Sequence, residues 1–429
     1  MKEPVFDINS ITVEKLDQFR HETDPLADQT VKTIIESGFE KQINQVFMTL
    51  VSNETYDENT FSKFDSGLAE TLNDYFQQSS KLPTWLDPNK VEKGERVFSL
   101  YGPQIFMILN VSSLPMCYTC AKGAQVLYET GRLMAHGGNT DPLARRLMET
   151  AQMIINVMAK GGVSAGGAGV VTTQKIRLIH ASIRYFLKSG QFGTPWDVQK
   201  YGEPINQEDL AGTLMSFGPV ILSGLKKLNI DLSDEEVDAY MHCWKVIGYC
   251  MGIQEELLPE TFEDGFELAT KILVHQAEES EAGKELTKSC ILFMKNIVPG
   301  NSFDDVPAFM IDYFFEDLSK ASDKDLSSIV AVGSKIDLKD KIVLSVAKFV
   351  TGLIGSLDHS EFVRKLTSLF NRALLQGIIY HFNDGKQVQF NIPPSLQKDW
   401  KIVENWENDW TSPEIFKKRL TIQKKIYTI

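Results

Sequence analysis

Cysteine is scarce in this chain, which holds five cysteines in 429 residues. A sparse and odd set is typical of a reducing compartment and argues against a disulfide framework. Cys117 and Cys120 form a CxxC, but no second pair with similar spacing completes a zinc site, and Ala121 stands where covalent haem attachment needs a histidine. We therefore interpret the cysteines as buried free thiols.

Positive charge is also in short supply. The formal net charge is −13 and the isoelectric point is near 5.2. Phosphate binding needs a concentration of lysine and arginine, so the composition argues against a nucleic-acid partner. One basic stretch near the C-terminus favours a solvated helix face or tail, with an anion-binding surface as the alternative; it contains Lys417, Lys418, Arg419, Lys424 and Lys425.

Neither a secretory signal nor a membrane span is evident. The N-terminal residues Met1–Asp7 lack the charged, then apolar, then small-residue order of a signal peptide. The most apolar long stretch, Val97–Met116, is better explained by a buried core helix than by a span of about 20 apolar residues. We expect a cytoplasmic protein with no transmembrane segment. The interruptions in that stretch are Gly102, Pro103, Gln104, Asn110 and Pro115.

Strand patterns are nearly absent, whereas helical periodicity dominates the chain. No GxSxG, Walker or kinase signature is present, so nucleophilic hydrolysis and phosphoryl transfer have no sequence support. We predict an all-α protein with a single large helical domain and, at most, one short β-hairpin near residues 381–390. Its core is expected over residues 85–300, between a largely irregular N-terminal extension with some helix, 1–84, and a C-terminal helical region packed on the core, 301–429.

Capping residues and apolar spacing locate the helices. Asp87 followed by Pro88 predicts an N-cap and a first helical residue, with a helix over about 88–96. Thr172 or Thr173 is predicted to cap a helix that runs to about Lys188 and ends at Gly190. The other predicted helices span 117–137, 141–161, 207–228, 234–252, 261–279, 283–296, 305–320, 337–353 and 359–379.

The segment Gly161–Gly169 is the most glycine-dense part of the chain. It follows a predicted helix rather than a strand and contains no GxxxxGK, so neither phosphate-binding fingerprint is met. Glycine allows close backbone approach, which favours contact with something flat or with another helix. A flexible connector is the alternative.

Three residues of the helix that follows carry the candidate chemistry. Residues three and four apart share a helix face, so Arg177, His180 and Arg184 line up beside Ile176 and Ile183. Two positive charges near an imidazole disfavour its protonation, and neutral imidazole is the form that binds metals.

A lone histidine cannot complete a site for a bare zinc or iron ion, which needs at least three protein ligands. It can serve as the single axial ligand of a haem, whose anionic propionates are natural partners for Arg177 and Arg184. The alternative is a core histidine whose neighbouring arginines pair with aspartate or glutamate elsewhere in the fold.

The residues around this helix resemble a known family. The segments Tyr128–Arg132, Arg146–Thr150 and Lys175–Arg184 are similar to the central region of the latex-clearing rubber oxygenases, a family that includes a fungal oxygenase shortening a prenyl chain in mycophenolic acid synthesis. The resemblance covers about Trp85 to Pro259. It continues through Gln207–Asp209, Phe217 and Tyr240–Trp244.

The resemblance implies a globin-like helical core that holds haem b through a proximal histidine, here His180, as ligand of the iron. It implies oxidative cleavage of a carbon-carbon double bond in an isoprenoid or another unsaturated lipid by dioxygen. Glu129 would be the acid or base near the bound oxygen, and Arg146 and Thr150 would shape the distal pocket. A non-catalytic haem-binding or sensor protein, and a helical interaction protein that has lost haem, are the alternatives.

Two departures from the family pattern affect the substrate. Glu149 stands where the rubber oxygenases place a lysine that caps the iron on the distal side, which puts that closed state in doubt. The missing export signal disfavours an enzyme that attacks solid rubber outside the cell. We therefore expect a soluble or membrane-derived hydrophobic substrate.

Overall fold

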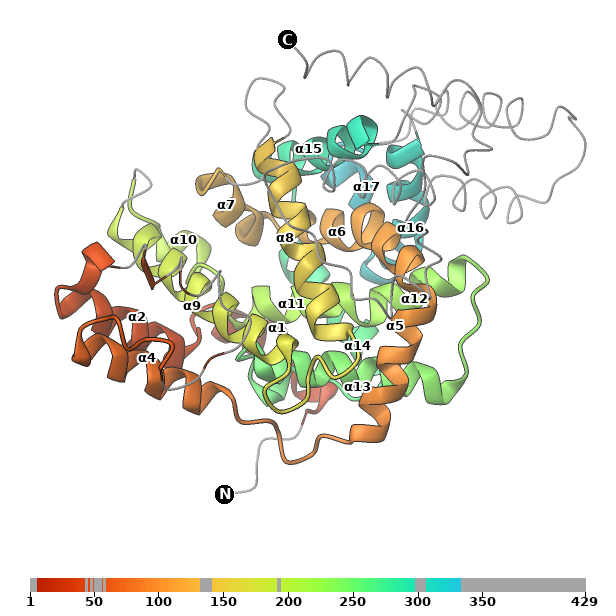
Figure 1. Cartoon of the computed structure of the whole chain (residues 1–429). Helices are drawn as coiled ribbons and strands as arrows, with labels where there is room; N and C mark the ends of the chain where they lie inside the picture. The colour runs from red at the N-terminus through yellow and green to blue at the C-terminus, as the bar shows by residue number, and fades with distance from the viewer. Residues whose placement is uncertain are drawn as a thin grey trace, which may run out of the picture. The chain divides into compact units, whose positions relative to one another are not determined.

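Helices make up the regular structure of the part of the chain that the computed structural model describes (Figure 1). Within that part the only β-type pairing is an isolated bridge between Cys120 and Ala277. The all-α prediction is confirmed, whereas the hairpin near 381–390 and the helices at 337–353 and 359–379 lie outside the described residues. The described residues are 6–42, 45–46, 49, 56, 59–131, 141–190, 194–297 and 306–332.

The chain divides into two compact units, and each unit consists of segments that lie far apart in the sequence. Unit 1 comprises Met1–Phe98, Gln152–Pro219 and Ser233–His275, and unit 2 comprises Ser99–Ala151, Val220–Leu232 and Gln276–Ile429.

Unit 1 contains the N-terminal helices and the helix of His180. Its elements are η1 (Ile8–Ser10), α1 (Val13–Phe19), α2 (Pro25–Glu36), η2 (Phe39–Gln42), α4 (Ser66–Ser79), the first half of α5 (Pro88–Ile108), the second half of α8 (Asp141–Met158), α9 (Ala168–Ser189), α10 (Val198–Tyr201), α11 (Gln207–Phe217), α13 (Asp234–Cys250), η5 (Glu255–Leu257) and α14 (Phe262–Gln276).

Unit 2 contains the remaining helices. They are the rest of α5 and α8, the π-helical turn η3 (Leu109–Ser113), α6 (Leu114–Thr119), α7 (Ala121–Glu129), α12 (Pro219–Lys227), α15 (Glu281–Ile297), α16 (Val306–Ser322) and α17 (Leu326–Ile329). Within this unit α15 packs on α6 and α7, and α16 packs on η3.

The helix ends show where local sequence rules hold. Asp87 Oδ1 accepts a hydrogen bond from Asn89 N at 2.8 Å, and α5 begins at Pro88 as predicted. Gly190 ends α9 with φ +79°, also as predicted. The predicted threonine cap is wrong, because α9 begins at Ala168 and the Thr172 and Thr173 hydroxyls donate to carbonyls inside the helix.

The glycine-rich segment brings two helices of unit 1 together. A Cβ placed on Gly169 would lie 2.7 Å from Val157 Cα and 2.6 Å from Gly162 O. Only glycine permits so close a contact between α9 and the end of α8. Of the two partners expected for this segment, a flat molecule or another helix, the structure has the helix.

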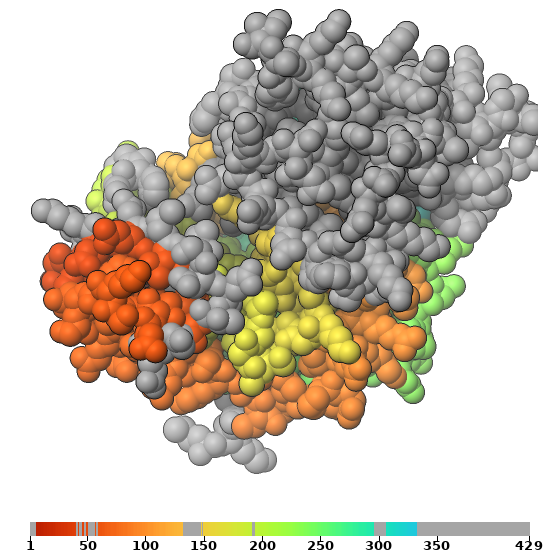
Figure 2. Space-filling view, viewed as in Figure 1, coloured from red at the N-terminus to blue at the C-terminus, as the bar shows by residue number. Residues whose placement is uncertain are grey.

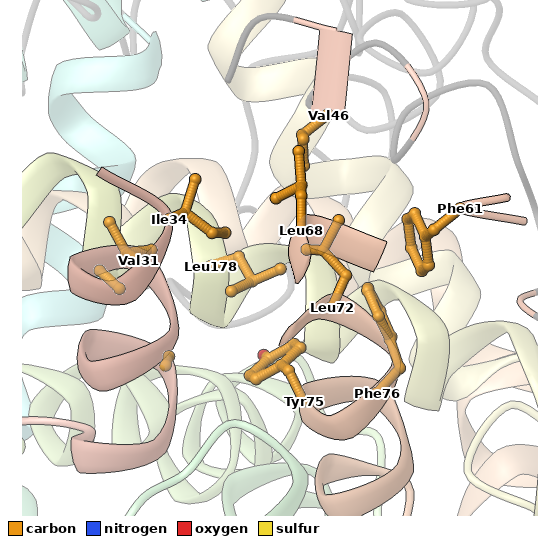
Figure 3. Close-up of a cluster of buried hydrophobic side chains, with 11 residues drawn as sticks. Val31, Ile34, Val46, Phe61, Leu68, Leu72, Tyr75, Phe76 and Leu178 are labelled. Carbon is orange, nitrogen blue, oxygen red and sulfur yellow. The ribbon is translucent and has the colours of Figure 1, made fainter. Parts of the chain in front are cut away.

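The core of unit 1 between α2, α4 and α9 is apolar and aromatic (Figure 3). Leu68, Leu72 and Phe76 project from α4, and Leu178 projects from α9 into the same cluster. Burying such side chains contributes about 1.5–3 kcal/mol each. The cluster anchors α9 against the N-terminal helices, which lie at the surface of unit 1 in red and orange (Figure 2).

One stretch of the described residues, Pro88–Thr119, is long and apolar enough to cross a membrane. Two thirds of its most apolar window is buried inside the structure. A buried core helix meets the same criteria of length and composition, and Pro103 lies within this helix.

Candidate functional site

His180 lies on the incompletely covered side of α9. Residues of this helix that face α2, α4 and α13 are buried, whereas His180 is half-buried. Its half-buried neighbours at helical spacing are Thr172, Ile176, Ile179, Ile183 and Phe186. The imidazole is therefore flanked by aliphatic and aromatic side chains that the protein leaves partly open.

Arg177, one turn before His180, is held by α2. Its Nε donates to Asp24 Oδ2 at 2.6 Å and its Nη2 donates to Asp24 Oδ1 at 2.8 Å, while Nη1 donates to the carbonyl of Cys250 at 3.4 Å. Both side chains are buried. Gly252 leaves them room, since its φ is +78° and a Cβ there would lie 2.9 Å from Arg177 Nε.

Arg184, one turn after His180, is held by the next turn of α2. Its Nε donates to Asp28 Oδ1 at 2.7 Å and its Nη1 donates to the carbonyl of Ile205 at 3.1 Å. Its Nη2 is buried and has no hydrogen-bond partner among the described residues. One donor of this guanidinium therefore stays open, which the planar fork of arginine makes suitable for an anionic group.

Both arginines pair with carboxylates of α2, as expected from the alternative interpretation in which they pair with aspartate or glutamate elsewhere in the fold. Each positive charge is matched by an aspartate, so the argument that two uncompensated charges act on His180 loses its basis. The clamp on an anionic cofactor stays a prediction, and only Arg184 has an open buried donor for it.

The donor set around His180 fits a haem. A half-buried imidazole, neighbouring isoleucines and one open arginine donor supply a ligand, an apolar wall and an anion partner. Among the described residues no group of three or more histidine, cysteine, aspartate or glutamate side chains could hold a bare metal ion.

The distal residues predicted from the sequence lie in unit 2. Glu129 ends α7 and is exposed, and its Oε1 accepts a hydrogen bond from Gln125 Nε2 at 2.7 Å. Exposure leaves it in contact with water.

Arg146 and Thr150 lie four residues apart on α8, so they share a face of that helix as predicted. Thr150 is half-buried and Glu149 is exposed. The side chain of Arg146 lies outside the described part of the structure.

A buried charge network in unit 1 was missed by sequence reasoning. Arg20 Nη1 lies 3.1 Å from Glu208 Oε2 and 3.0 Å from Asp209 Oδ1, and Glu208 Oε1 lies 2.6 Å from His275 Nδ1. Burial raises the pKa of Glu208, against the lowering effect of His275 and Arg20. In the sequence, only Gln207–Asp209 drew attention to this network. Arg20 did not, because its region was expected to be irregular.

His242 has a structural partner. It is buried, and its Nε2 accepts a hydrogen bond from Asp87 N at 3.0 Å, so it fixes the chain where α5 begins. Glu260 lies beside it and also pairs with Lys245. A structural role therefore accounts for this histidine.

Part of the chain is similar to a family of known proteins. Residues 115–317 match the family model described as ER-bound oxygenase mpaB/B'/Rubber oxygenase, catalytic domain. The rubber oxygenase of Streptomyces sp. (strain K30) is 20% identical over 267 residues, which is 62% of this chain and 61% of that protein. The chain thus spans about three fifths of the length of this relative.

A solved structure of latex clearing protein LCP in the closed state has a similar fold. The TM-score is 0.64 at 17% identity, over 87% of this chain and 95% of that one. At this identity the likeness concerns the fold alone.

Residues 115–317 of this chain match that family of oxygenase catalytic domains, so the resemblance drawn from the residues is confirmed. Glu129, Arg146, Thr150 and the α9 residues all lie inside the matched segment. The candidate residues therefore lie in the part of the chain that resembles an oxygenase catalytic domain.

Proposed function

We propose that the protein is a haem b-dependent oxygenase that cleaves a carbon-carbon double bond of an isoprenoid or another unsaturated lipid with dioxygen. The observation that supports it most is the position of His180, half-buried on an apolar side of α9 and inside the segment that matches the family model. A single imidazole with isoleucine neighbours suits a haem and does not suit a bare ion.

His180 would hold the haem iron through an imidazole nitrogen, with Ile176 and Ile183 beside the ring. The open Nη2 of Arg184 would pair with a propionate. When bound, the haem supplies the redox chemistry that activates dioxygen. The contribution of α9 is to bind and orient the group and to keep water from its apolar side.

Glu129 would hold or move a proton at its Oε atoms during cleavage, with Gln125 orienting the carboxylate. Because Glu129 is exposed, this role requires that a bound substrate cover it and exclude water. The hydroxyl of Thr150 and the guanidinium of Arg146 would orient the substrate or dioxygen from one face of α8.

The substrate would be a soluble or membrane-derived isoprenoid chain rather than solid rubber. Glu149, exposed on α8, cannot take the part of a neutral amine ligand to iron. None of the five cysteines forms a disulfide, which supports a cytoplasmic, reducing compartment.

Oxygen uptake by the haem-loaded protein with a short isoprenoid alkene tests the enzymatic proposal. We expect uptake and carbonyl products, with at least a tenfold loss of rate in Glu129→Gln, in line with the usual contribution of a general acid or base. Glu281→Gln, at an exposed glutamate of unit 2 outside the candidate site, is the matched control. Equal rates in Glu129→Gln and wild type would remove Glu129 from the mechanism.

A haem-binding protein without oxygenase activity is the second candidate, and the exposure of Glu129 favours it. It predicts a normal haem spectrum and reversible gas binding with no oxygen consumption by any alkene. The same uptake experiment separates the two.

A further inference from the structure

Two carboxylates on one helix meet two arginines on another. Asp24 is the N-cap of α2 and Asp28 lies four residues later, on the same side of that helix. Arg177 and Arg184 lie seven residues apart, which is close to two turns, on one side of α9. The two helices pack against each other along their length.

The hydrogen bonds of Arg177 and Arg184 fix the orientation of both side chains. The pair between Arg177 and Asp24 is bidentate and buried, which fixes the plane of the guanidinium. Arg177 also donates to the carbonyl of Cys250, and Arg184 donates to the carbonyl of Ile205. Each arginine is therefore held from two directions, and α9 cannot turn about its axis without breaking buried hydrogen bonds.

His180 stands between the two arginines, one turn from each. A side-chain nitrogen of a helix residue lies about 6 Å from the helix axis, so a rotation of about 20° would move it by about 2 Å. Displacements of about 1 Å are enough to impair a site that needs exact geometry.

We propose that Asp24 and Asp28 are positioning residues for His180, acting through Arg177 and Arg184 to set the rotation of α9 and hence the direction of the imidazole. The inference rests on the proposed haem function of His180. It assigns to the N-terminal helix α2, outside the segment that matches the family model, a part in the site.

The chain offers a matched control in the same unit. Asp209 also faces a buried arginine, Arg20, at 3.0 Å, and ties the N-terminal segment to α11 without contacting α9. Asp209→Asn removes one carboxylate from a buried arginine, as Asp24→Asn does. Because Arg20 keeps Glu208 as a second carboxylate partner, the urea midpoints of both variants are measured as well, which separates loss of stability from a change in the direction of His180. That change would appear only in Asp24→Asn.

The experiment loads the full-length chain with haem b and measures the Soret maximum and the rate of haem transfer to apomyoglobin. We expect Asp24→Asn to shift the maximum and to accelerate haem loss by about tenfold or more, the size of effect typical of residues that orient metal ligands. Asp24→Glu should restore much of the wild-type rate, and Asp209→Asn should behave as wild type.

Hydrogen exchange in the haem-free chain gives a second readout, with faster exchange of α9 amides expected in Asp24→Asn than in Asp209→Asn. If Asp24→Asn fails to fold, Asp28→Asn serves instead, because Asp28 is partly exposed and makes one hydrogen bond to Arg184.

Unchanged spectra and unchanged haem loss in these variants, or an equal effect of Asp209→Asn, would overturn this inference and leave the proposed function standing. Wild-type protein without a Soret band would overturn the proposed function and this inference with it.

Discussion

Arg177 of α9 and Asp24 of α2 form a buried bidentate ion pair, with N–O distances of 2.6 and 2.8 Å. Each of the two residues is less than one tenth exposed. The pair joins residues 153 positions apart in the sequence and neutralises a charge that would otherwise be buried next to the candidate haem ligand.

Removing one partner of the Arg177–Asp24 ion pair should strongly destabilise the folded protein. We expect Arg177→Met to lower the free energy of unfolding by about 3–5 kcal/mol, because Asp24 is left as an uncompensated buried charge. The double variant Arg177→Met with Asp24→Asn should lose less, since no charge stays buried. Urea unfolding measures both. The exposed pair between Lys32 and Glu36 provides a control, as Lys32→Met should cost less than about 1 kcal/mol. A double variant as unstable as Arg177→Met would contradict the argument.

Close packing between α5 and α13 predicts an effect opposite to helix propensity. A Cβ on Gly94 would lie 2.5 Å from both the Ala239 carbonyl oxygen and Cys243 Sγ. Alanine is the better helix former by about 1 kcal/mol, yet Gly94→Ala should destabilise by about 1–3 kcal/mol because backbone atoms must move. Thermal unfolding checks this, with Gly67→Ala as control, where the nearest atom lies at 3.5 Å. Unchanged stability in Gly94→Ala would mean that the two helices can separate at little cost.

Glu260 predicts a pH dependence of stability. The nearby imidazole of His242, with a further contribution from the ammonium of Lys245, lowers the pKa of Glu260 from 4.5 to about 2 despite partial burial. A carboxylate with a depressed folded-state pKa stabilises the fold above its unfolded value, and this stabilisation is lost as the pH falls from about 5 towards 2.

The difference in stability between wild type and Glu260→Gln should therefore be larger at pH 6 than at pH 4. We expect it to stay below about 1 kcal/mol, since half of this side chain is exposed to solvent. Urea midpoints at the two pH values measure it, and the exposed Glu263→Gln is the control. A difference that is constant or grows towards pH 4 is the result that this account does not allow.

The sequence was sufficient for features set by local chemistry. Pro88 marks the start of α5, because the first turn of a helix does not need the backbone N–H that proline lacks. Gly190 marks the end of α9, because glycine readily adopts a positive φ. The helical face shared by Arg177, His180 and Arg184 follows from spacing alone. Thr172 failed as a cap because the helix could begin four residues earlier, at the glycines that pack on α8.

Partners distant in the sequence could not be predicted. Asp24 and Asp28 lie in a region that was expected to be irregular, and nothing in their own sequence points to Arg177 or Arg184. The same holds for Arg20, whose partners Glu208 and Asp209 are 188 and 189 residues away. The exposure of Glu129 is likewise decided by the packing around the end of α7.

The absorption spectrum of the purified protein after loading with haem b tests the central claim most directly. The account predicts a Soret band in wild type and its loss or a large blue shift in His180→Ala, with the band retained in His242→Ala, whose histidine has a structural partner. A wild-type spectrum without a Soret band, or a band unchanged in His180→Ala, would contradict the assignment of His180 as the haem ligand.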